Sequence, residues 1–145
     1  AMTPFLGQGM NCALEDCTVL LDCLDRHGGH WGRAFEHFGA LRRPDTDAIA
    51  RLSLLNCEEM MAQTRTAAYV ERKRLEARLT TMSPQTFVPI YSTITFGHMP
   101  YAKIMRIKQL QDALLDRLQA RGAGAPAELL RAGLQDYQEQ LAQIG

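Results

Sequence analysis

The chain has 145 residues, 46% of them hydrophobic, and its 16 basic residues balance its 16 acidic ones. This length and composition are typical of one globular domain with a modest core, and the zero net charge argues against a nucleic-acid or anionic-membrane partner held by bulk charge. Because no apolar run reaches membrane-spanning length and no charged segment followed by an apolar one opens the chain, we expect a cytoplasmic protein without a membrane segment.

The first predicted element is an amphipathic helix over residues 11–27, which follows a glycine-rich segment and ends at a pair of glycines. Its apolar positions recur at helical spacing. We expect them to form the buried face of this helix: Leu14, Cys17, Leu20, Leu21 and Leu24. The four cysteines of the chain include no Cys-x-x-Cys pair, which indicates reduced and buried thiols and not disulfides.

Two helices separated by a proline are predicted next. Residues 31–43 form the first, and Pro44 is expected to end it and to occupy the first turn of the second. The second carries Asn56, Glu59 and Met60 at i, i+3 and i+4, so these side chains should share one face. Two polar groups and a thioether on an apolar face are typical of a pocket wall, but the same pattern occurs where a helix face meets solvent.

The second half of the chain is predicted to be helical with one interruption. Residues 66–80 form a helix whose basic run over 71–78 should be a solvated face with i,i+4 ion pairs. The prolines and the β-branched stretch within 82–96 predict an extended or irregular segment. Helices over 101–121 and from Ala127 onward follow. Each has an apolar stripe at helical spacing, formed by Ile104, Ile107, Leu110, Leu114 and Leu118 in the first and by Leu129, Leu130, Leu134, Tyr137 and Leu141 in the last. With no βαβ pattern and no Gly-x-Gly-x-x-Gly fingerprint, the expected fold class is mainly α.

The opening segment reads Pro4-Phe5-Leu6-Gly7-Gln8-Gly9-Met10-Asn11 and leads into the first helix. Glycines spaced by one residue allow the backbone to approach a flat ligand closely. The start of a helix adds N–H groups and a positive dipole end, which suit negative charge or electron-rich carbonyls. This pattern indicates a ligand-binding turn, and the alternative is a tight turn that binds nothing.

The opening segment resembles the second flavin-binding motif of the aromatic-hydroxylating flavin monooxygenases, Pro-x-x-Gly-Gln-Gly-x-Asn, which meets the isoalloxazine ring near N1 and the C2 carbonyl. Three further stretches resemble the kynurenine 3-monooxygenase family: Leu41-Arg42-Arg43-Pro44-Asp45, Asn56-x-x-Glu59-Met60, and Phe87-Val88-Pro89-x-Tyr91-Ser92-x-x-Thr95-Phe96. The likeness runs from residue 2 to about residue 105. It implies the C-terminal helical part of an α/β FAD-dependent monooxygenase, of the bacterial anchor-free type, whose Rossmann-like FAD domain lies largely outside this chain.

The resemblance assigns roles to individual residues. Those implied to bind the FAD ring are Pro4, Gln8, Gly9, Met10 and Asn11. Those implied to bind the substrate are Phe5, Asn56, Glu59, Met60 and Tyr91, with the tyrosine donating to the substrate carboxylate. No catalytic residue is assigned, because the flavin performs the oxygen chemistry and no side chain here is a convincing general base.

The implied reaction is the hydroxylation of L-kynurenine to 3-hydroxykynurenine in tryptophan catabolism, with FAD as cofactor and NADPH and O2 as co-substrates. Residues 1–27 would form the flavin-contacting loop and helix, 28–121 the substrate side, and 122–145 a linker and a last helix. The implied partner is the missing N-terminal FAD-binding segment, and a homodimer is left open. The alternatives are a flavin hydroxylase for another aromatic substrate and a non-catalytic helical interaction module.

Other chemistries find little support in the sequence. Cys23 and His27 are spaced to share a helix face, but His30 lies beyond the glycine pair and a fourth metal ligand is missing. Ser53 and Cys57 have no histidine partner at a suggestive spacing. We therefore expect neither a metal site nor a nucleophilic mechanism.

Overall fold

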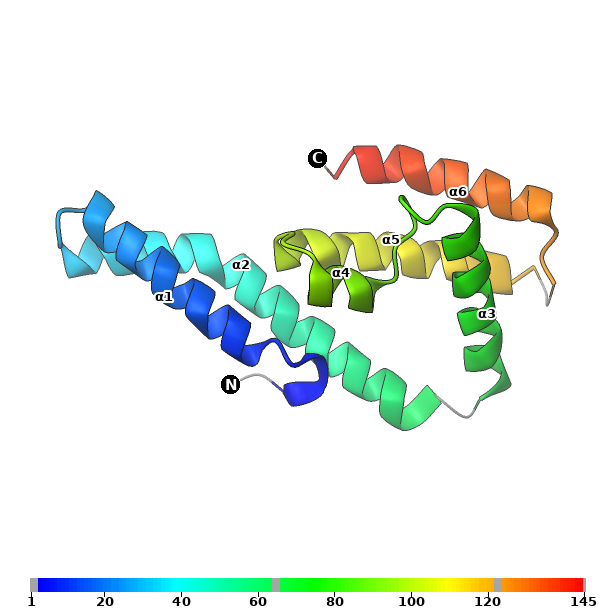
Figure 1. Cartoon of the computed structure of the whole chain (residues 1–145), viewed down its shortest axis with the longest axis horizontal. Helices are drawn as coiled ribbons and strands as arrows, with labels where there is room; N and C mark the ends of the chain where they lie inside the picture. Colours follow the sequence, from blue (N-terminus) through cyan, green and yellow to red (C-terminus); the bar gives the residue numbers. More distant parts are fainter. Residues whose placement is uncertain (1–2, 64–65, 122–123, 145) are drawn as a thin grey trace. The chain divides into compact units, whose positions relative to one another are not determined.

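The computed structural model describes residues 3–63, 66–121 and 124–144, and these ranges contain helices and no strand (Figure 1). The predicted mainly α fold class is therefore confirmed. The helices are η1 (Pro4–Leu6, a 3-10 turn), α1 (Gly9–Arg26), α2 (Trp31–Glu58), η2 (Glu59–Gln63, π-helical), α3 (Ala67–Met82), α4 (Ile90–Phe96), α5 (Tyr101–Gln119) and α6 (Ala127–Ala142).

The chain folds as two compact units that divide between Cys57 and Glu58. The first unit contains η1, α1 and α2, together with the short segment Pro100–Ala102. The second contains η2, α3, α4, the remainder of α5, and α6. The boundaries expected from the sequence, after residues 27 and 121, divide the chain by the function proposed for each segment and not by compactness. They stay a prediction.

In the first unit, α1 and α2 form an antiparallel helical hairpin (Figure 1). Gly28 and Gly29 have φ angles of 57° and 78° and turn the chain after α1, as the sequence predicted. Beside that turn, Nε2 of His27, which precedes the glycine pair, lies 3.2 Å from Nδ1 of His37 on α2. Near the other end of the hairpin, the hydroxyl of Ser53 donates to the carbonyl of Thr3 over 2.7 Å.

Helix α2 continues through Pro44, so the prediction of two separate helices is wrong. A proline in a helix interior lacks the N–H donor and crowds the preceding turn, at a cost of about 3 kcal/mol. Tertiary contacts on both sides of Pro44 offset this cost. Arg42 pairs with Asp16 on α1, and Ile49 is completely buried.

Helix α1 packs with a different face from the one that its apolar pattern predicted. Cys12 and Cys23 are buried, whereas Cys17 is exposed, and Leu14 and Leu21 are 61% and 62% exposed. The predicted burial of these last three side chains is wrong. Periodicity identifies which residues share a face but not which face meets a neighbour.

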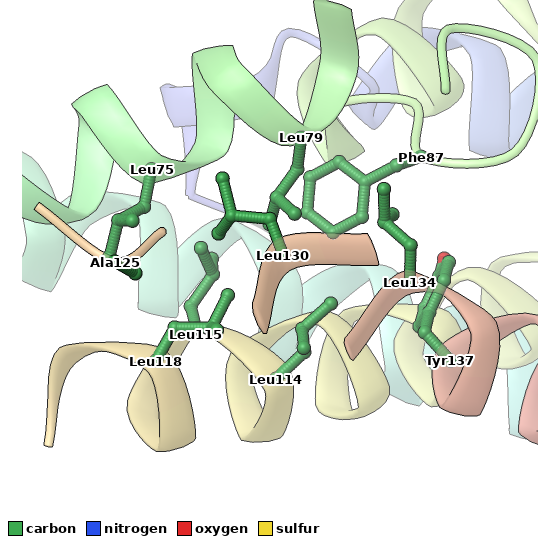
Figure 2. Packing of buried hydrophobic residues seen from close by; sticks show 10 residues of the cluster. All are labelled: Leu75, Leu79, Phe87, Leu114, Leu115, Leu118, Ala125, Leu130, Leu134 and Tyr137. Carbon is green, nitrogen blue, oxygen red and sulfur yellow. The ribbon is translucent and has the colours of Figure 1, made fainter. Parts of the chain in front are cut away.

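The core of the second unit lies where α3, α5 and α6 meet (Figure 2). Its buried members are Leu75, Leu79, Phe87, Leu114, Leu115, Leu118, Ala125, Leu130, Leu134 and Tyr137. The rings of Phe87 and Tyr137 pack with centroids 5.5 Å apart. The helical stripes of α5 and α6 read from the sequence are thus largely the ones that form this core.

Part of the basic run on α3 ties the second unit together. Arg72 pairs with Asp112 and Asp116 on α5, and its side chain is only 18% exposed. Arg78 donates to the carbonyl of Ala125 over 2.9 Å. The prediction of a merely solvated face is therefore wrong for these two arginines, because their partners lie far away in the sequence.

The segment over 83–89 is irregular, as predicted, but Ile90–Phe96 forms the short helix α4 and not an extended stretch. β-branched residues are only slightly disfavoured in helices. Here Ile94 is buried at 4% exposure, and the Thr93 hydroxyl bonds back to the carbonyl of Pro89. Burial of one side chain outweighs a weak local preference.

Candidate functional site

The glycine-rich opening segment uses its two central glycines differently. Gly7 has a φ of 66° and donates its N–H to the carbonyl of Pro4 over 3.1 Å, which closes η1. This left-handed conformation favours glycine. Gly9 begins α1, and a Cβ atom added there would meet nothing within 4 Å. Gly7 therefore turns the chain, and Gly9 leaves open space beside the first turn of α1.

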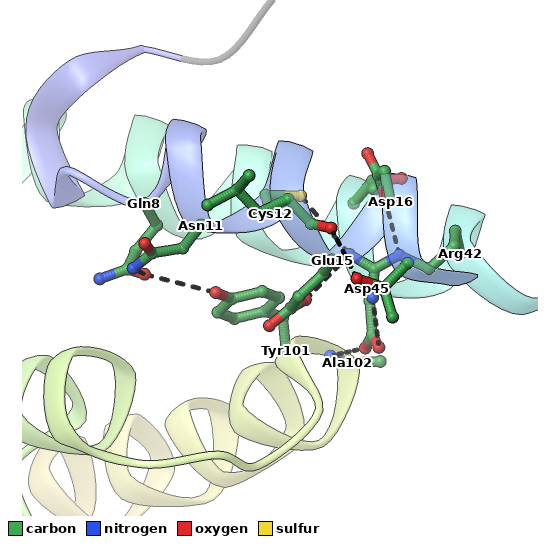
Figure 3. Close-up of polar contacts among 12 residues, drawn as sticks. Gln8, Asn11, Cys12, Glu15, Asp16, Arg42, Asp45, Tyr101 and Ala102 are labelled. Carbon is green, nitrogen blue, oxygen red and sulfur yellow. Dashed lines mark hydrogen bonds and ion pairs between the residues drawn. The ribbon is translucent and has the colours of Figure 1, made fainter. Parts of the chain in front are cut away.

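Gln8 holds this turn from the inside (Figure 3). Its side chain is 6% exposed, and its oxygen accepts hydrogen bonds from Asn11 Nδ2 at 2.9 Å and from the Tyr101 hydroxyl at 3.4 Å. No side chain caps the N-terminus of α1. The groups that face outward from this turn therefore include the first-turn backbone and the exposed side chains of Met10 and Asn11.

Two side chains of α2 anchor the segment that leads into α1. The hydroxyls of Ser53 and Thr3 lie 2.7 Å apart, and Asn56 Nδ2 donates to the carbonyl of Phe5 over 3.1 Å. The Phe5 ring remains 38% exposed. The structure thus brings together two of the residues predicted to bind the substrate, Phe5 and Asn56.

A buried arginine links α1, α2 and the first residues of α5 (Figure 3). Arg42 is 8% exposed and reaches Asp16 at 2.7 Å, Glu15 at 3.0 Å and Asp45 at 3.9 Å. Asp45 in turn accepts the backbone N–H of Ala102 at 2.8 Å. This network lies one to two turns beyond Gly9 along α1, and it fixes the helix that carries the glycine-rich segment.

The electrostatics of this network keep the Cys12 thiol and the Tyr101 phenol neutral beside a charged arginine. Burial raises the pKa of the Cys12 thiol, which Asp16 reinforces and Arg42 opposes. Burial also raises the pKa of Tyr101, with a further contribution from Glu15. Burial alone would lower the pKa of Arg42, but its bonds to the two carboxylates raise it. Cys12 is therefore a protonated structural thiol, and Tyr101 remains a donor to Gln8.

From the sequence alone, Arg42 received no function other than its place in the family-like stretch Leu41–Asp45, and Tyr101 received none. The adjacent acids Glu15 and Asp16 near the start of α1 are a local signal that a basic side chain can pair there. Sixteen basic residues are candidates in the chain, and nothing local selects one of them. Only the packing of α2 on α1 identifies the partner.

The other predicted substrate residues lie in the second unit. The α-helical ladder of α2 ends at Glu58, and Glu59 and Met60 belong to the π-helical η2. That they share one helix face with Asn56 stays a prediction. Glu59 pairs with Lys73 at 3.6 Å, and Tyr91 on α4 is 58% exposed. Their roles toward a substrate stay predictions.

Two general features of the described chain complete the picture. Within residues 3–63, 66–121 and 124–144, no three His, Cys, Asp or Glu side chains gather in a way that could hold a metal ion. None of the helices described combines the length and the apolar character needed to cross a bilayer.

The chain is homologous to kynurenine 3-monooxygenases, as its motifs predicted. It is 35% identical to the kynurenine 3-monooxygenase of Flavobacterium johnsoniae over 118 residues, 81% of this chain and 26% of that relative. The corresponding enzyme of Anopheles gambiae is 38% identical over 118 residues, 81% of this chain and 24% of the relative. That of Candida albicans is 34% identical over 136 residues, 92% of this chain and 30% of the relative.

The chain thus spans about a quarter of the length of the curated relatives that it matches. No protein-family model matches it. The similarity extends over 118 to 136 residues and so covers most of the chain.

Proposed function

We propose that this chain is part of an FAD-dependent monooxygenase that converts L-kynurenine to 3-hydroxykynurenine with NADPH and O2. One observation carries the proposal. In a chain homologous to kynurenine 3-monooxygenases, the flavin-type segment Pro4 to Asn11 stands at an uncapped helix start with open space at Gly9. The proposed reaction is the one for which the relatives are named, and the geometry of this segment supports a contact with the cofactor.

The residues present fit the ring end of FAD. The uncapped first turn of α1 offers backbone N–H groups, and Asn11 adds an exposed polar side chain. Such groups, with the positive end of the helix dipole, stabilise negative charge on the carbonyl side of an isoalloxazine ring. When bound, the flavin supplies the redox and oxygen chemistry. The described residues hold no strand, so a βαβ unit for the pyrophosphate has to come from elsewhere.

The proposed role of the remaining site residues is to orient the substrate and to exclude water. Asn56 fixes the carbonyl of Phe5, so the half-exposed Phe5 ring is presented from an anchored backbone. Tyr91 presents an exposed phenol that can donate to the carboxylate of kynurenine. These residues would increase the rate of hydroxylation by holding the aromatic ring of the substrate in one orientation, and not by transferring a proton.

The gene that encodes these residues, expressed from its natural start to its natural stop, tests the proposal. The purified product is expected to carry FAD, to oxidise NADPH faster with L-kynurenine than with 4-hydroxybenzoate, and to form 3-hydroxykynurenine detectable by mass spectrometry. Stimulation by a different aromatic acid alone would favour the alternative substrate. A colourless product that takes up no FAD would contradict the proposal altogether.

A pair of glycine variants separates cofactor contact from folding. A side chain at Gly9 or at Gly39 meets nothing within 4 Å in this chain. Gly9→Val and Gly39→Val in the gene product should therefore both fold, but only Gly9→Val should lower the FAD content, because its branched side chain blocks the approach of the ring. Equal FAD content in the two variants would remove Gly9 from the cofactor site.

A tyrosine pair tests the substrate contact. Tyr91→Phe should raise KM for kynurenine about tenfold or more while FAD content is unchanged, because one hydrogen bond to a charged group is lost. Tyr69→Phe is the matched control, since the Tyr69 ring faces Lys73 within α3. If both variants have the parent KM, Tyr91 does not bind the carboxylate.

A further inference from the structure

We propose that Tyr101 is a positioning residue for the cofactor: its phenol fixes the side-chain amide of Gln8, so that the nitrogen end of that amide is left to donate a hydrogen bond to the flavin ring. Tyr101 is the first residue of α5, and none of the family-like stretches read from the sequence contains it. The inference rests on the proposed function, because it concerns the FAD that the glycine-rich turn is proposed to contact.

The oxygen of the Gln8 side chain accepts from two donors (Figure 3). Asn11 Nδ2 lies 2.9 Å from this oxygen, and the Tyr101 hydroxyl lies 3.4 Å from it. The phenol is available as a donor because burial raises the pKa of Tyr101 and keeps it protonated. Two donors on one atom decide which way round the planar amide lies, so its nitrogen points the other way.

The nitrogen end of this amide has no partner in the described part of the chain. Gln8 is only 6% exposed, and within residues 3–63, 66–121 and 124–144 its Nε2 group makes no hydrogen bond. The unpaired side-chain atoms that are fully enclosed in these ranges are the hydroxyls of Thr80 and Thr95. The Nε2 group is not among them, so it reaches the surface. A buried glutamine thus offers an unused donor to a ligand that lies against the turn.

The same turn carries further donors of the same kind. Gln8 is the N-cap residue of α1, and no side chain caps this end of the helix. The first backbone N–H groups of a helix have no partner within it, and they lie at the positive end of the helix dipole. Together with Nε2 of Gln8, they suit the electron-rich carbonyl side of an isoalloxazine ring.

The ring of Tyr101 is held in place independently of its hydroxyl. The residue is 7% exposed, and the N–H of the following residue, Ala102, donates to the carboxylate of Asp45 over 2.8 Å. Asp45 is itself 3.9 Å from Arg42. Loss of the hydroxyl should therefore leave the ring where it is and remove only the contact with Gln8. This makes Tyr101→Phe a specific test of the contact.

A second buried tyrosine provides a closely matched control. Tyr137 is 1% exposed, and its hydroxyl accepts from the side-chain amide of Gln111 over 3.3 Å. It belongs to the core of the second unit and not to the glycine-rich turn. Tyr101→Phe and Tyr137→Phe each remove one contact between a phenol and a glutamine, so we expect similar losses of stability in urea denaturation.

The test uses the product of the whole encoding gene, freed of FAD and titrated with FAD while flavin fluorescence is followed. Tyr101→Phe should raise the dissociation constant of FAD about threefold or more, because the amide of Gln8 is no longer held in one orientation. It should also shift the visible absorption of the bound flavin. Tyr137→Phe should leave both quantities as in the parent. Equal dissociation constants and spectra in the two variants would overturn the proposal and leave Tyr101 a structural residue.

A double-mutant cycle tests whether Tyr101 acts through Gln8. Gln8→Met removes the amide but keeps an unbranched side chain, and it should by itself weaken FAD binding. Tyr101→Phe added to Gln8→Met should cause no further change in the dissociation constant, because no amide is left to position. A further rise as large as that caused by Tyr101→Phe alone would overturn the route through Gln8.

The outcomes separate this inference from the proposed function. A parent protein that binds FAD but hydroxylates another aromatic compound would contradict the proposed reaction and leave the inference standing. A parent that binds FAD and hydroxylates kynurenine, with Tyr101→Phe indistinguishable from Tyr137→Phe, would overturn the inference alone. A parent that binds no FAD would overturn both.

Discussion

The side-chain amide of Asn11 donates a hydrogen bond to the side-chain oxygen of Gln8 over 2.9 Å. Gln8 is buried and Asn11 is exposed, so this bond joins the inside of the glycine-rich turn to its outside. The Tyr101 hydroxyl approaches the same oxygen at 3.4 Å. The turn proposed to meet a flavin is therefore held from the inside by a buried side chain, an arrangement that favours a rigid binding surface.

Gln8→Leu should lower the free energy of unfolding by about 1 to 3 kcal/mol, because the amide of Asn11 and the hydroxyl of Tyr101 lose their acceptor. Urea denaturation followed by circular dichroism measures the change. The control is Gln85→Leu, an exposed position between α3 and α4, which should stay within about 0.5 kcal/mol of the parent. A Gln8 variant as stable as the control would show that the buried bonds do not stabilise the turn.

Arg42→Met should be more damaging, with a loss of about 3 kcal/mol, because the carboxylates around a largely buried arginine lose their partner. The side chain of the neighbouring Arg43 is 83% exposed and pairs with the exposed Asp47. Arg43→Met should therefore cost less than about 1 kcal/mol. Equal losses in the two variants, measured by the same denaturation, would contradict the bridging role of Arg42.

Pro44→Ala should stabilise the chain by about 1 to 3 kcal/mol, because alanine restores a backbone donor inside α2 and removes the clash with the preceding turn. The gain is reduced by the extra freedom that the unfolded chain acquires. Helical content measured by circular dichroism should stay the same, since α2 is already continuous at this position. A lower melting temperature in the variant would indicate that the proline shapes α2 in a way that the fold needs.

Stability should fall at high pH, and Tyr137 should be one cause. Burial raises the pKa of its phenol above the ordinary value of 10.0, although a hydrogen bond from Gln111 acts in the opposite direction. The folded state then holds its proton more tightly than the unfolded state. This contribution is complete below pH 10 and is lost as the pH rises through the folded pKa.

Tyr137→Phe should accordingly flatten the decline of unfolding free energy above about pH 10, the unfolded pKa of a phenol. Tyr101 contributes in the same sense, so the decline should be reduced and not abolished. Urea denaturation at a series of pH values measures the profile. An unchanged profile in the Tyr137 variant would remove this residue from the explanation.

Much of the fold follows from local pattern. The helical stretches around α3, α5 and α6, the glycine pair that turns the chain after α1, and the apolar stripes of α5 and α6 were all readable from spacing. The segments around α5 and α6 are periodic, so their short-range preferences and their tertiary packing agree. The flavin-type segment and the family resemblance were likewise present in the order of the residues alone.

Tertiary structure decided the features for which local and long-range forces disagree. Pro44 stays inside α2 because tertiary contacts on both sides of it outweigh its local cost. The segment Ile90–Phe96 forms a helix because Ile94 becomes buried. Arg42 and Arg72 find their carboxylates at distant positions that no local rule specifies. The amino-acid order thus determined where helices form, while the placement of neighbours determined which face of α1 is covered, since burial depends on a partner's position and not on periodicity.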